Sequence, residues 1–239
     1  MGKVLKRIGI ALLIILLLAA GAFYFIFGVR YFRAGEAAQN FMESTDEVTV
    51  TRHDSFITFD GPGEGILLLF YPGARVQPEA YAPVLFRAAK AGVDSRIYDM
   101  PLHLAILDSD RALMDAQSFD GKVYIGGHSL GGMCAAELTV EHPVFFDGLI
   151  LIGSRAARPV PDIPTLSIQG DLDGLATPEK LRKAEENLPD DYVRFLVAGG
   201  NHAQFGDYGK QPMDNPAAIE PEEQWRQTAD AIALFCAER

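Results

Sequence analysis

One serine, two aspartates and one histidine lie where they could carry out nucleophilic catalysis. Ser129 is at the centre of Gly127-His128-Ser129-Leu130-Gly131, directly after an apolar run. Asp171 and Asp173 follow a second apolar run, and His202 follows a third. A serine hydroxyl becomes a nucleophile when a histidine removes its proton, and a carboxylate holds that histidine in the right tautomer. The set therefore predicts attack on a carbonyl carbon, with Asp171 or Asp173 as the acid.

These side chains need a scaffold that brings several strand ends together. Buried strands are predicted at 65–71, 95–98, 123–125, 148–152, 165–168 and 192–197. Helices are predicted at 78–92, 130–140, 177–188 and 222–238, with 102–116 helical in part and a β-hairpin at 47–51 and 55–59. Strands that alternate with helices indicate an α/β fold, a mostly parallel sheet with helices on both faces. The carboxyl ends of its strands meet at one edge, so we expect the catalytic residues to converge there.

The motifs and their order along the chain resemble the α/β-hydrolase superfamily. The likeness is to its small cap-less esterase and dienelactone-hydrolase-like branches, and it covers about residues 46–239. It rests on Gly127-His128-Ser129-Leu130-Gly131-Gly132, on Gly170 with Asp173, and on Gly200-Asn201-His202 with Phe205. The resemblance implies an α/β-hydrolase fold and selects Asp173 as the acid, because the family places this acid three residues after the glycine. Only residues 155–163 separate two predicted strands where lids are usually inserted, so we expect no cap domain.

The resemblance also implies a chemistry. The expected reaction is hydrolysis of an ester or related acyl bond through an acyl-serine intermediate on the Ser129, His202 and Asp173 triad, with no metal or organic cofactor. The tetrahedral intermediate needs two backbone N–H donors, which form an oxyanion hole. Leu130 should supply one donor, because it follows the nucleophile at the start of a helix. By the family match Ala74 supplies the other, although this chain has Tyr-Pro-Gly-Ala where relatives often have His-Gly-x.

Three further residues are candidates for the substrate pocket. His103 follows another predicted strand end, Arg75 is next to the proposed oxyanion donor, and Phe205 belongs to a long loop beside the catalytic histidine. Arg75 could orient a substrate carboxylate or could pair with an acidic neighbour. We expect His128 to have a structural role, with its side chain packed beside the sheet edge.

The charge of the chain restricts its partners. The net charge is −11, and five basic residues (Lys3, Lys6, Arg7, Arg30 and Arg33) all precede the first acidic residue. The remainder has 16 basic and 32 acidic residues, a net charge of −16. Such an acidic body disfavours binding to nucleic acid or to anionic lipid headgroups. A small-molecule or lipid-like acyl substrate is expected instead.

The cysteines and the acidic residues after Gly170 do not match a disulfide framework, a cysteine-based metal site or a calcium loop. Cys134 and Cys236 form no disulfide framework and lack metal-binding spacing, so we expect two buried thiols. The Asp171, Asp173 and Gly174 pattern lacks the remaining ligands of a calcium loop.

The N-terminus predicts a membrane anchor. We expect a basic tail at 1–7, a transmembrane anchor at 8–27, a tether at 28–45 and the hydrolase domain at 46–239. The uncharged run at 8–27 would span roughly 30 Å as a helix, the thickness of the bilayer core. Ala20-Gly21-Ala22 resembles a signal-peptidase site, so a cleaved signal peptide and a secreted protein are the alternative. The charge bias favours a cytoplasmic N-terminus and an extracytoplasmic hydrolase domain.

Other functions remain open at the sequence level. The same triad could serve an acyltransferase, a peptidase or a thioesterase. The chain could also be a membrane-displayed, non-catalytic binding module with a hydrolase fold. The presence of all three triad residues favours catalysis, whereas the acyl group, the leaving group and the oligomeric state are not specified by the sequence.

Overall fold

The computed structural model describes residues 2–63 and 65–239. Within them, eight strands form one sheet in the order β1-β2-β4-β3-β5-β6-β7-β8. The strands are β1 (Thr49–Arg52), β2 (Phe56–Asp60), β3 (Ile66–Tyr71), β4 (Asp94–Tyr98), β5 (Lys122–His128), β6 (Gly148–Ile152), β7 (Thr165–Gly170) and β8 (Val193–Val197). β2 is antiparallel to both β1 and β4, and the other neighbouring pairs are parallel. The predicted hairpin and mostly parallel sheet are therefore confirmed.

Helices precede, separate and follow these strands. The α-helices are α1 (Gly2–Tyr24), α2 (Glu36–Asn40), α3 (Ala82–Lys90), α4 (Leu113–Ser118), α5 (Leu130–Glu141), α6 (Pro178–Ala184) and α7 (Pro221–Glu238). A π-helical turn, η1 (Phe25–Val29), extends α1. Short 3-10 turns are η2 (Pro78–Tyr81), η3 (Pro101–His103), η4 (Ala105–Leu107), η5 (Pro143–Phe145), η6 (Glu185–Asn187) and η7 (Ala203–Phe205). The predicted helical segment at 102–116 is thus three short pieces.

The two faces of the sheet bury separate cores. Side chains alternate along a strand, so Leu67 and Leu69 of β3 face one side while Leu68 and Phe70 face the other. The core on the side of Leu67 and Leu69 also contains residues of α4 and α5. The core on the side of Leu68 and Phe70 contains residues of α3 and α7. Helices therefore cover both faces, and the apolar strand β3 is buried on each side.

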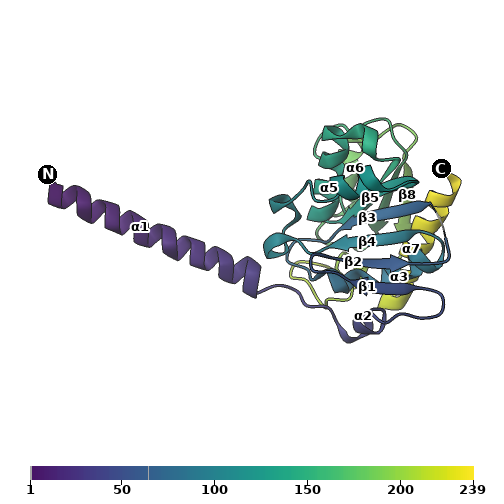
Figure 1. Cartoon of the computed structure of the whole chain (residues 1–239), viewed down its shortest axis with the longest axis horizontal. Helices are drawn as coiled ribbons and strands as arrows, with labels where there is room; N and C mark the ends of the chain where they lie inside the picture. Colours follow the sequence, from purple (N-terminus) through teal and green to yellow (C-terminus); the bar gives the residue numbers. More distant parts are fainter. Residues whose placement is uncertain (1, 64) are drawn as a thin grey trace.

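Helix α1 projects away from this body as one extended helix (Figure 1). Residues 4–29 contain an 18-residue window with a mean hydropathy of 2.8, and the span is long and apolar enough to cross a membrane. The segment predicted as a tether contains α2 and packs on the body, because Ala38 is fully buried and its N–H donates to the Asp207 carboxylate at 2.8 Å.

The connection between β6 and β7 is short. Residues 153–164 form neither a helix nor a strand, although β6 and β7 are parallel neighbours. Gly153 and Ser154 directly follow β6, so this connection places them at the carboxyl edge of the sheet.

Candidate active site

Ser129 occupies a strained turn between β5 and α5. Its backbone has φ 53° and ψ −119°, a region that non-glycine residues rarely adopt. Two hydrogen bonds hold this conformation: Ser129 N–H donates to the Ile152 carbonyl at 3.0 Å, and Ser154 Oγ donates to the Ser129 carbonyl at 2.6 Å. The strain lifts the serine above the end of β5, as a nucleophile elbow requires.

Glycines permit the close packing of this turn. A Cβ on Gly131 would lie 2.2 Å from the Tyr71 carbonyl oxygen and 2.4 Å from that of Pro72. A Cβ on Gly127 would lie 2.5 Å from the Gly131 carbonyl carbon. The first turn of α5 therefore lies directly on the end of β3, at distances that only glycine allows.

His202 and Asp173 form a buried pair beside this turn. His202 Nδ1 lies 2.7 Å from Asp173 Oδ2, and the two residues are only 1% and 2% exposed. The other carboxylate oxygen, Oδ1, accepts N–H bonds from Leu175 at 2.8 Å and Ala176 at 2.7 Å. Because both carboxylate oxygens act as acceptors, the proton of the imidazole belongs on Nδ1, which leaves Nε2 able to accept a proton.

The serine and the histidine share one cavity. Ser129 and His202 both line a cavity of about 280 Å³, together with Gly153, Ser154 and Leu175. His202 Nε2 is buried and makes no hydrogen bond in the described part of the chain. One cavity is therefore lined both by the strained Ser129 and by His202, whose orientation is set by Asp173 and whose Nε2 has no hydrogen-bond partner in the described residues.

Asp171 lies apart from the histidine. Its Oδ1 accepts the Gly199 N–H at 2.6 Å, and its side chain is exposed. Of the two aspartates that the sequence offers, the structure pairs Asp173 with His202.

The two predicted oxyanion donors lie at the same edge. Leu130 is the first residue of α5, and Ala74 lies in the loop that follows β3. This loop packs on the serine turn, because a Cβ on Gly73 would lie 2.8 Å from His128 Nδ1. Within the described chain neither the Leu130 nor the Ala74 N–H donates a backbone hydrogen bond. Neither residue lines the cavity that Ser129 and His202 share, so their role as oxyanion donors stays a prediction.

His128 connects that loop to the serine turn. The Gly73 N–H donates to Tyr81 Oη at 3.0 Å, and Tyr81 Oη lies 2.8 Å from His128 Nδ1. The His128 ring centroid is 4.4 Å from that of His202. Burial, and then repulsion from His202, holds the pKa of His128 well below its usual value, so this imidazole stays neutral. Its contacts are structural.

Two of the predicted pocket residues lie elsewhere. Arg75 Nε donates to the Arg30 carbonyl at 3.0 Å, and the His103 ring lies 3.9 Å from the Tyr31 ring. Neither residue lines the cavity of Ser129; both contact the chain that leaves α1. Phe205 is 1% exposed, with its ring 5.7 Å from that of His128, so it packs beneath the site.

Asp214 and Ser154 also support the site, although no sequence motif points to them. Asp214 Oδ1 accepts the Gly174 N–H at 3.0 Å, and Oδ2 accepts the Ala203 N–H at 2.8 Å. Asp214 thereby joins the acid loop to the histidine loop. Neither Asp214 nor Ser154 has a motif around it, so only the tertiary contacts identify them.

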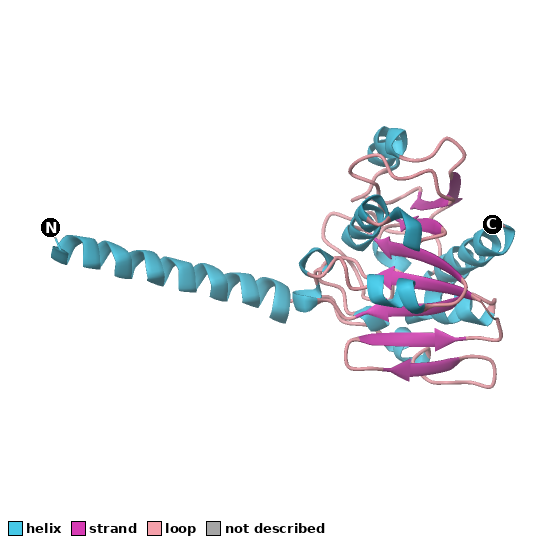
Figure 2. Cartoon of the chain, turned by 45° about the horizontal axis from the view of Figure 1, so that its top comes forward, coloured by secondary structure: helices cyan, strands magenta, loops and turns pink. Residues whose placement is uncertain are grey.

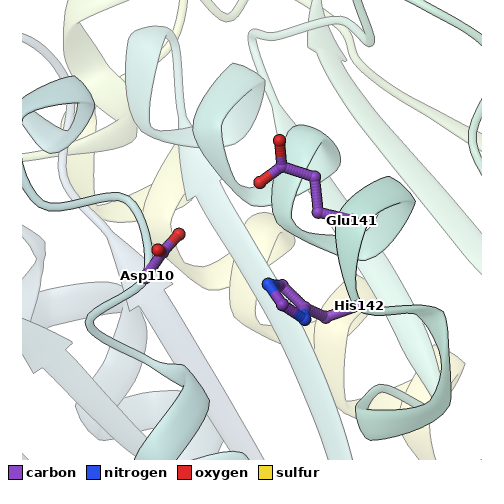
Figure 3. Close-up of side chains that lie close together, drawn as sticks. All are labelled: Asp110, Glu141 and His142. Atoms are coloured by element: carbon purple, nitrogen blue, oxygen red, sulfur yellow. The ribbon is translucent and has the colours of Figure 1, made fainter.

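Three side chains of metal-binding type gather at the far end of α5. Asp110, Glu141 and His142 place ligand atoms within 4.8 Å of one another (Figure 3). The two acids are exposed, and Glu141 also lies 3.6 Å from Arg158 in an ion pair. Such groups are common on acidic surfaces without an ion. The helix of α5 separates this cluster from Ser129 by roughly 18 Å.

Comparisons with known proteins agree with this geometry. The sequence profile described as the Alpha/beta hydrolase family matches residues 67–226, more than half of the chain. NocK of Nocardia uniformis subsp. tsuyamanensis, whose name describes it as a candidate esterase, is 35% identical over 96 residues. That match covers 36% of this chain and 28% of NocK, so the chain matches less than a third of that relative's length.

Solved structures share the fold. Est1E from Butyrivibrio proteoclasticus has a TM-score of 0.59 and 14% identity, over 81% of this chain and 98% of its own. A protein described as a CIB-like hydrolase from Thermoplasma acidophilum has a TM-score of 0.58 and 15% identity, over 78% of this chain and 99% of its own. At these identities the likeness shows the fold alone. With the family profile, it establishes that the chain has the α/β-hydrolase fold and belongs to the alpha/beta hydrolase family.

Proposed function

We propose that this protein is a serine hydrolase that cleaves an ester or related acyl bond through an acyl-serine intermediate. One observation carries the proposal: the buried His202–Asp173 pair opens on the same cavity as the strained Ser129. A hydrolase is what the family supports, and an ester substrate agrees with the name of NocK. The triad and its chemistry are the proposal.

In the first half-reaction, His202 Nε2 removes the proton from Ser129 Oγ as the oxygen attacks the substrate carbonyl carbon. The tetrahedral intermediate places its negative oxygen between the N–H groups of Leu130 and Ala74. His202 then gives the proton to the leaving alcohol, the bond to the alcohol breaks, and an acyl-Ser129 ester remains. Asp173 stabilises the imidazolium while it carries the proton.

In the second half-reaction, water replaces the alcohol. His202 removes one proton from water, the hydroxide attacks the acyl carbon, and the same two N–H groups hold the oxyanion. The bond to Ser129 Oγ breaks as His202 returns the proton to that oxygen, which releases the carboxylic acid. His202 Nε2 has no partner in the described chain, and catalytic hydrogen bonds of this kind often tighten only when substrate binds.

We propose further that the site has no cap domain. The connection at 153–164, where lids are usually inserted, lacks a helix or strand. An uncapped cavity would admit bulky acyl or leaving groups.

We propose that α1 is an uncleaved membrane anchor, with the hydrolase domain outside the cytoplasm. Support comes from the 26-residue span at 4–29, which is long and apolar enough to cross a membrane, and from the excess of basic residues before it, which favours a cytoplasmic N-terminus. The apolar run continues through Phe23-Tyr24-Phe25-Ile26-Phe27, beyond the possible cleavage site at Ala20-Gly21-Ala22, and is longer than the apolar region of a usual signal peptide.

The test is hydrolysis of p-nitrophenyl esters of increasing chain length by the full-length protein in detergent. We expect turnover that Ser129→Ala and His202→Ala abolish and that Ser118→Ala, the same type of change on exposed α4, leaves intact. A folded wild-type protein without turnover, or a Ser129→Ala variant with undiminished turnover, would contradict the proposal. Turnover that appears only with thioester, peptide or alcohol-acceptor substrates would assign the same triad to a different acyl transfer.

A further inference from the structure

The end of the apolar helix is tied to the body by hydrogen bonds. η1 ends at Val29, and only Arg30 and Tyr31 separate it from Phe32. The Phe32 N–H donates to the Arg75 carbonyl at 2.6 Å, and the Phe32 carbonyl accepts the Gln77 N–H at 2.9 Å. The Arg75 guanidinium in turn donates to the Arg30 carbonyl. The chain that leaves the helix therefore pairs with the body almost at once.

The surface to which it pairs is the catalytic edge of the sheet. Arg75 follows β3, and His103, which contacts Tyr31, follows β4. Carboxyl ends of parallel strands share one edge, and Ser129, Asp173 and His202 follow β5, β7 and β8 at that edge. Figure 2 shows the arrowheads of the parallel strands on the side of the body from which α1 departs.

Chain length places this edge close to the membrane surface. Three steps from Val29 to Phe32 span at most about 10 Å. Headgroups add roughly 5–8 Å to each side of the apolar core, so Phe32 and the loop that it pairs with lie at or just above the headgroups. That loop contains Gly73, which touches the residue next to Ser129. The serine therefore lies near the bilayer of its own anchor.

The side chains of this region suit an amphiphilic substrate. The cavity of Ser129 is lined by the apolar side chains of Met133, Leu175 and Leu181. The connection after β4 exposes Ile106 by 63% and Leu107 by 49%, although large apolar side chains are usually covered. The net negative charge of the body does not attract it to anionic lipid. The backbone pairing of Phe32 with the loop after β3 therefore holds the carboxyl edge of the sheet near the membrane.

We propose that the substrate is an ester-bearing amphiphile embedded in the bilayer, which enters the site from the membrane that holds α1. The inference rests on the proposed hydrolase function and on α1 as an anchor. It predicts that activity on a membrane-embedded ester depends on the distance between the anchor and the catalytic edge, whereas activity on a soluble ester does not.

The experiment lengthens that distance without altering the pairing at Phe32. A flexible Gly-Ser linker of about twelve residues, inserted between Val29 and Arg30, would let the body move roughly 20 Å from the bilayer. The matched control carries the same linker between Gly2 and Lys3, before the membrane span. Each full-length protein is reconstituted in phosphatidylcholine vesicles and assayed with 4-methylumbelliferyl oleate in the bilayer and 4-methylumbelliferyl acetate in solution.

We expect the ratio of oleate to acetate turnover to fall for the Val29–Arg30 insertion and to stay unchanged for the control. Effective concentration falls as about the −3/2 power of tether length, so a tether lengthened about fivefold should reduce the ratio roughly tenfold. An unchanged or higher ratio with acetate turnover present would overturn this inference and leave the hydrolase proposal standing. A wild type that cleaves neither ester would overturn both.

Discussion

Replacement of Asp173 by asparagine tests how the histidine is oriented. In the native site, Asp173 Oδ1 accepts two backbone N–H bonds while Oδ2 accepts the proton of His202 Nδ1. An asparagine has one acceptor oxygen and one donor NH2 group. If its oxygen takes the place of Oδ1, its NH2 group faces Nδ1, which must then become an acceptor. The proton moves to Nε2, and the histidine can no longer deprotonate Ser129.

The opposite orientation of the amide is worse for folding. Its NH2 group would then face the N–H groups of Leu175 and Ala176, and two buried hydrogen bonds would be lost at about 1 kcal/mol each or more. The first orientation is therefore favoured, with the wrong tautomer. Loss of the correct tautomer costs roughly 10³- to 10⁴-fold in kcat, about 4–5 kcal/mol of transition-state stabilisation.

The assay is p-nitrophenyl acetate hydrolysis by full-length wild type, Asp173→Asn and Asp171→Asn, with thermal unfolding to show that each variant folds. Asp171→Asn is the matched control, since the exposed Asp171 carboxylate accepts the Gly199 N–H and makes no contact with His202 in the described part of the chain. We expect the control to keep its kcat within a factor of a few. A loss of less than tenfold in Asp173→Asn, or a larger loss in Asp171→Asn, would show that Asp173 does not set the tautomer of His202.

Gly131→Ala should abolish activity, because the added Cβ would lie 2.2 Å from the Tyr71 carbonyl oxygen. Gly9→Ala is the control and should have no effect, because nothing lies within 4 Å of its added Cβ. Equal kcat values for the two variants would contradict this prediction. Burial lowers the pKa of His128 in the folded protein. As pH falls below about 6.5, the unfolded chain therefore binds a proton at this residue before the folded protein does. The free energy of unfolding then falls by up to about 1.4 kcal/mol per pH unit. In urea unfolding, the stability advantage of wild type over His128→Gln should therefore shrink from about pH 7 to about pH 5, and a constant difference would count against a neutral buried imidazole. Membranes washed at alkaline pH should retain the full-length protein, and its release would argue against an anchor at α1.

Much of the fold could be predicted because its signals are local. β3 reads as a continuous apolar run, since it is buried on both faces, and α5 begins directly after the glycine-flanked serine. α6 begins where Thr177 accepts the Lys180 N–H at its N-terminus, a capping pattern visible in sequence. Periodicity and caps depend on neighbours along the chain, so they can be predicted from the sequence.

Contacts between distant segments leave no local pattern in the sequence. Arg75 and His103 follow strand ends, which made them candidates for the pocket, but their partners are Arg30 and Tyr31, far earlier in the chain. No periodic pattern encodes such a pairing. Likewise, the sequence predicts a tether at 28–45, and only the buried contact of Ala38 with Asp207 shows that this segment packs on the body.

The convergence of Ser129, Asp173 and His202 on one edge followed from strand order, whereas the choice of Asp173 needed the family resemblance. In space the choice depends on which carboxylate lies behind the histidine, and the 2.7 Å contact to Asp173 supplies that information. Asp214 holds the two loops together through backbone N–H groups, and backbone partners leave no trace in sequence spacing.

The central claim is that Ser129 is a nucleophile activated by His202. Its most direct test is reaction of the folded, full-length protein with a fluorophosphonate probe, followed by intact mass and peptide mapping. We predict one adduct, on the peptide that contains Ser129, which is lost in Ser129→Ala and strongly slowed in His202→Ala. A folded wild-type protein that resists the probe, or an adduct on any other residue, would contradict the claim.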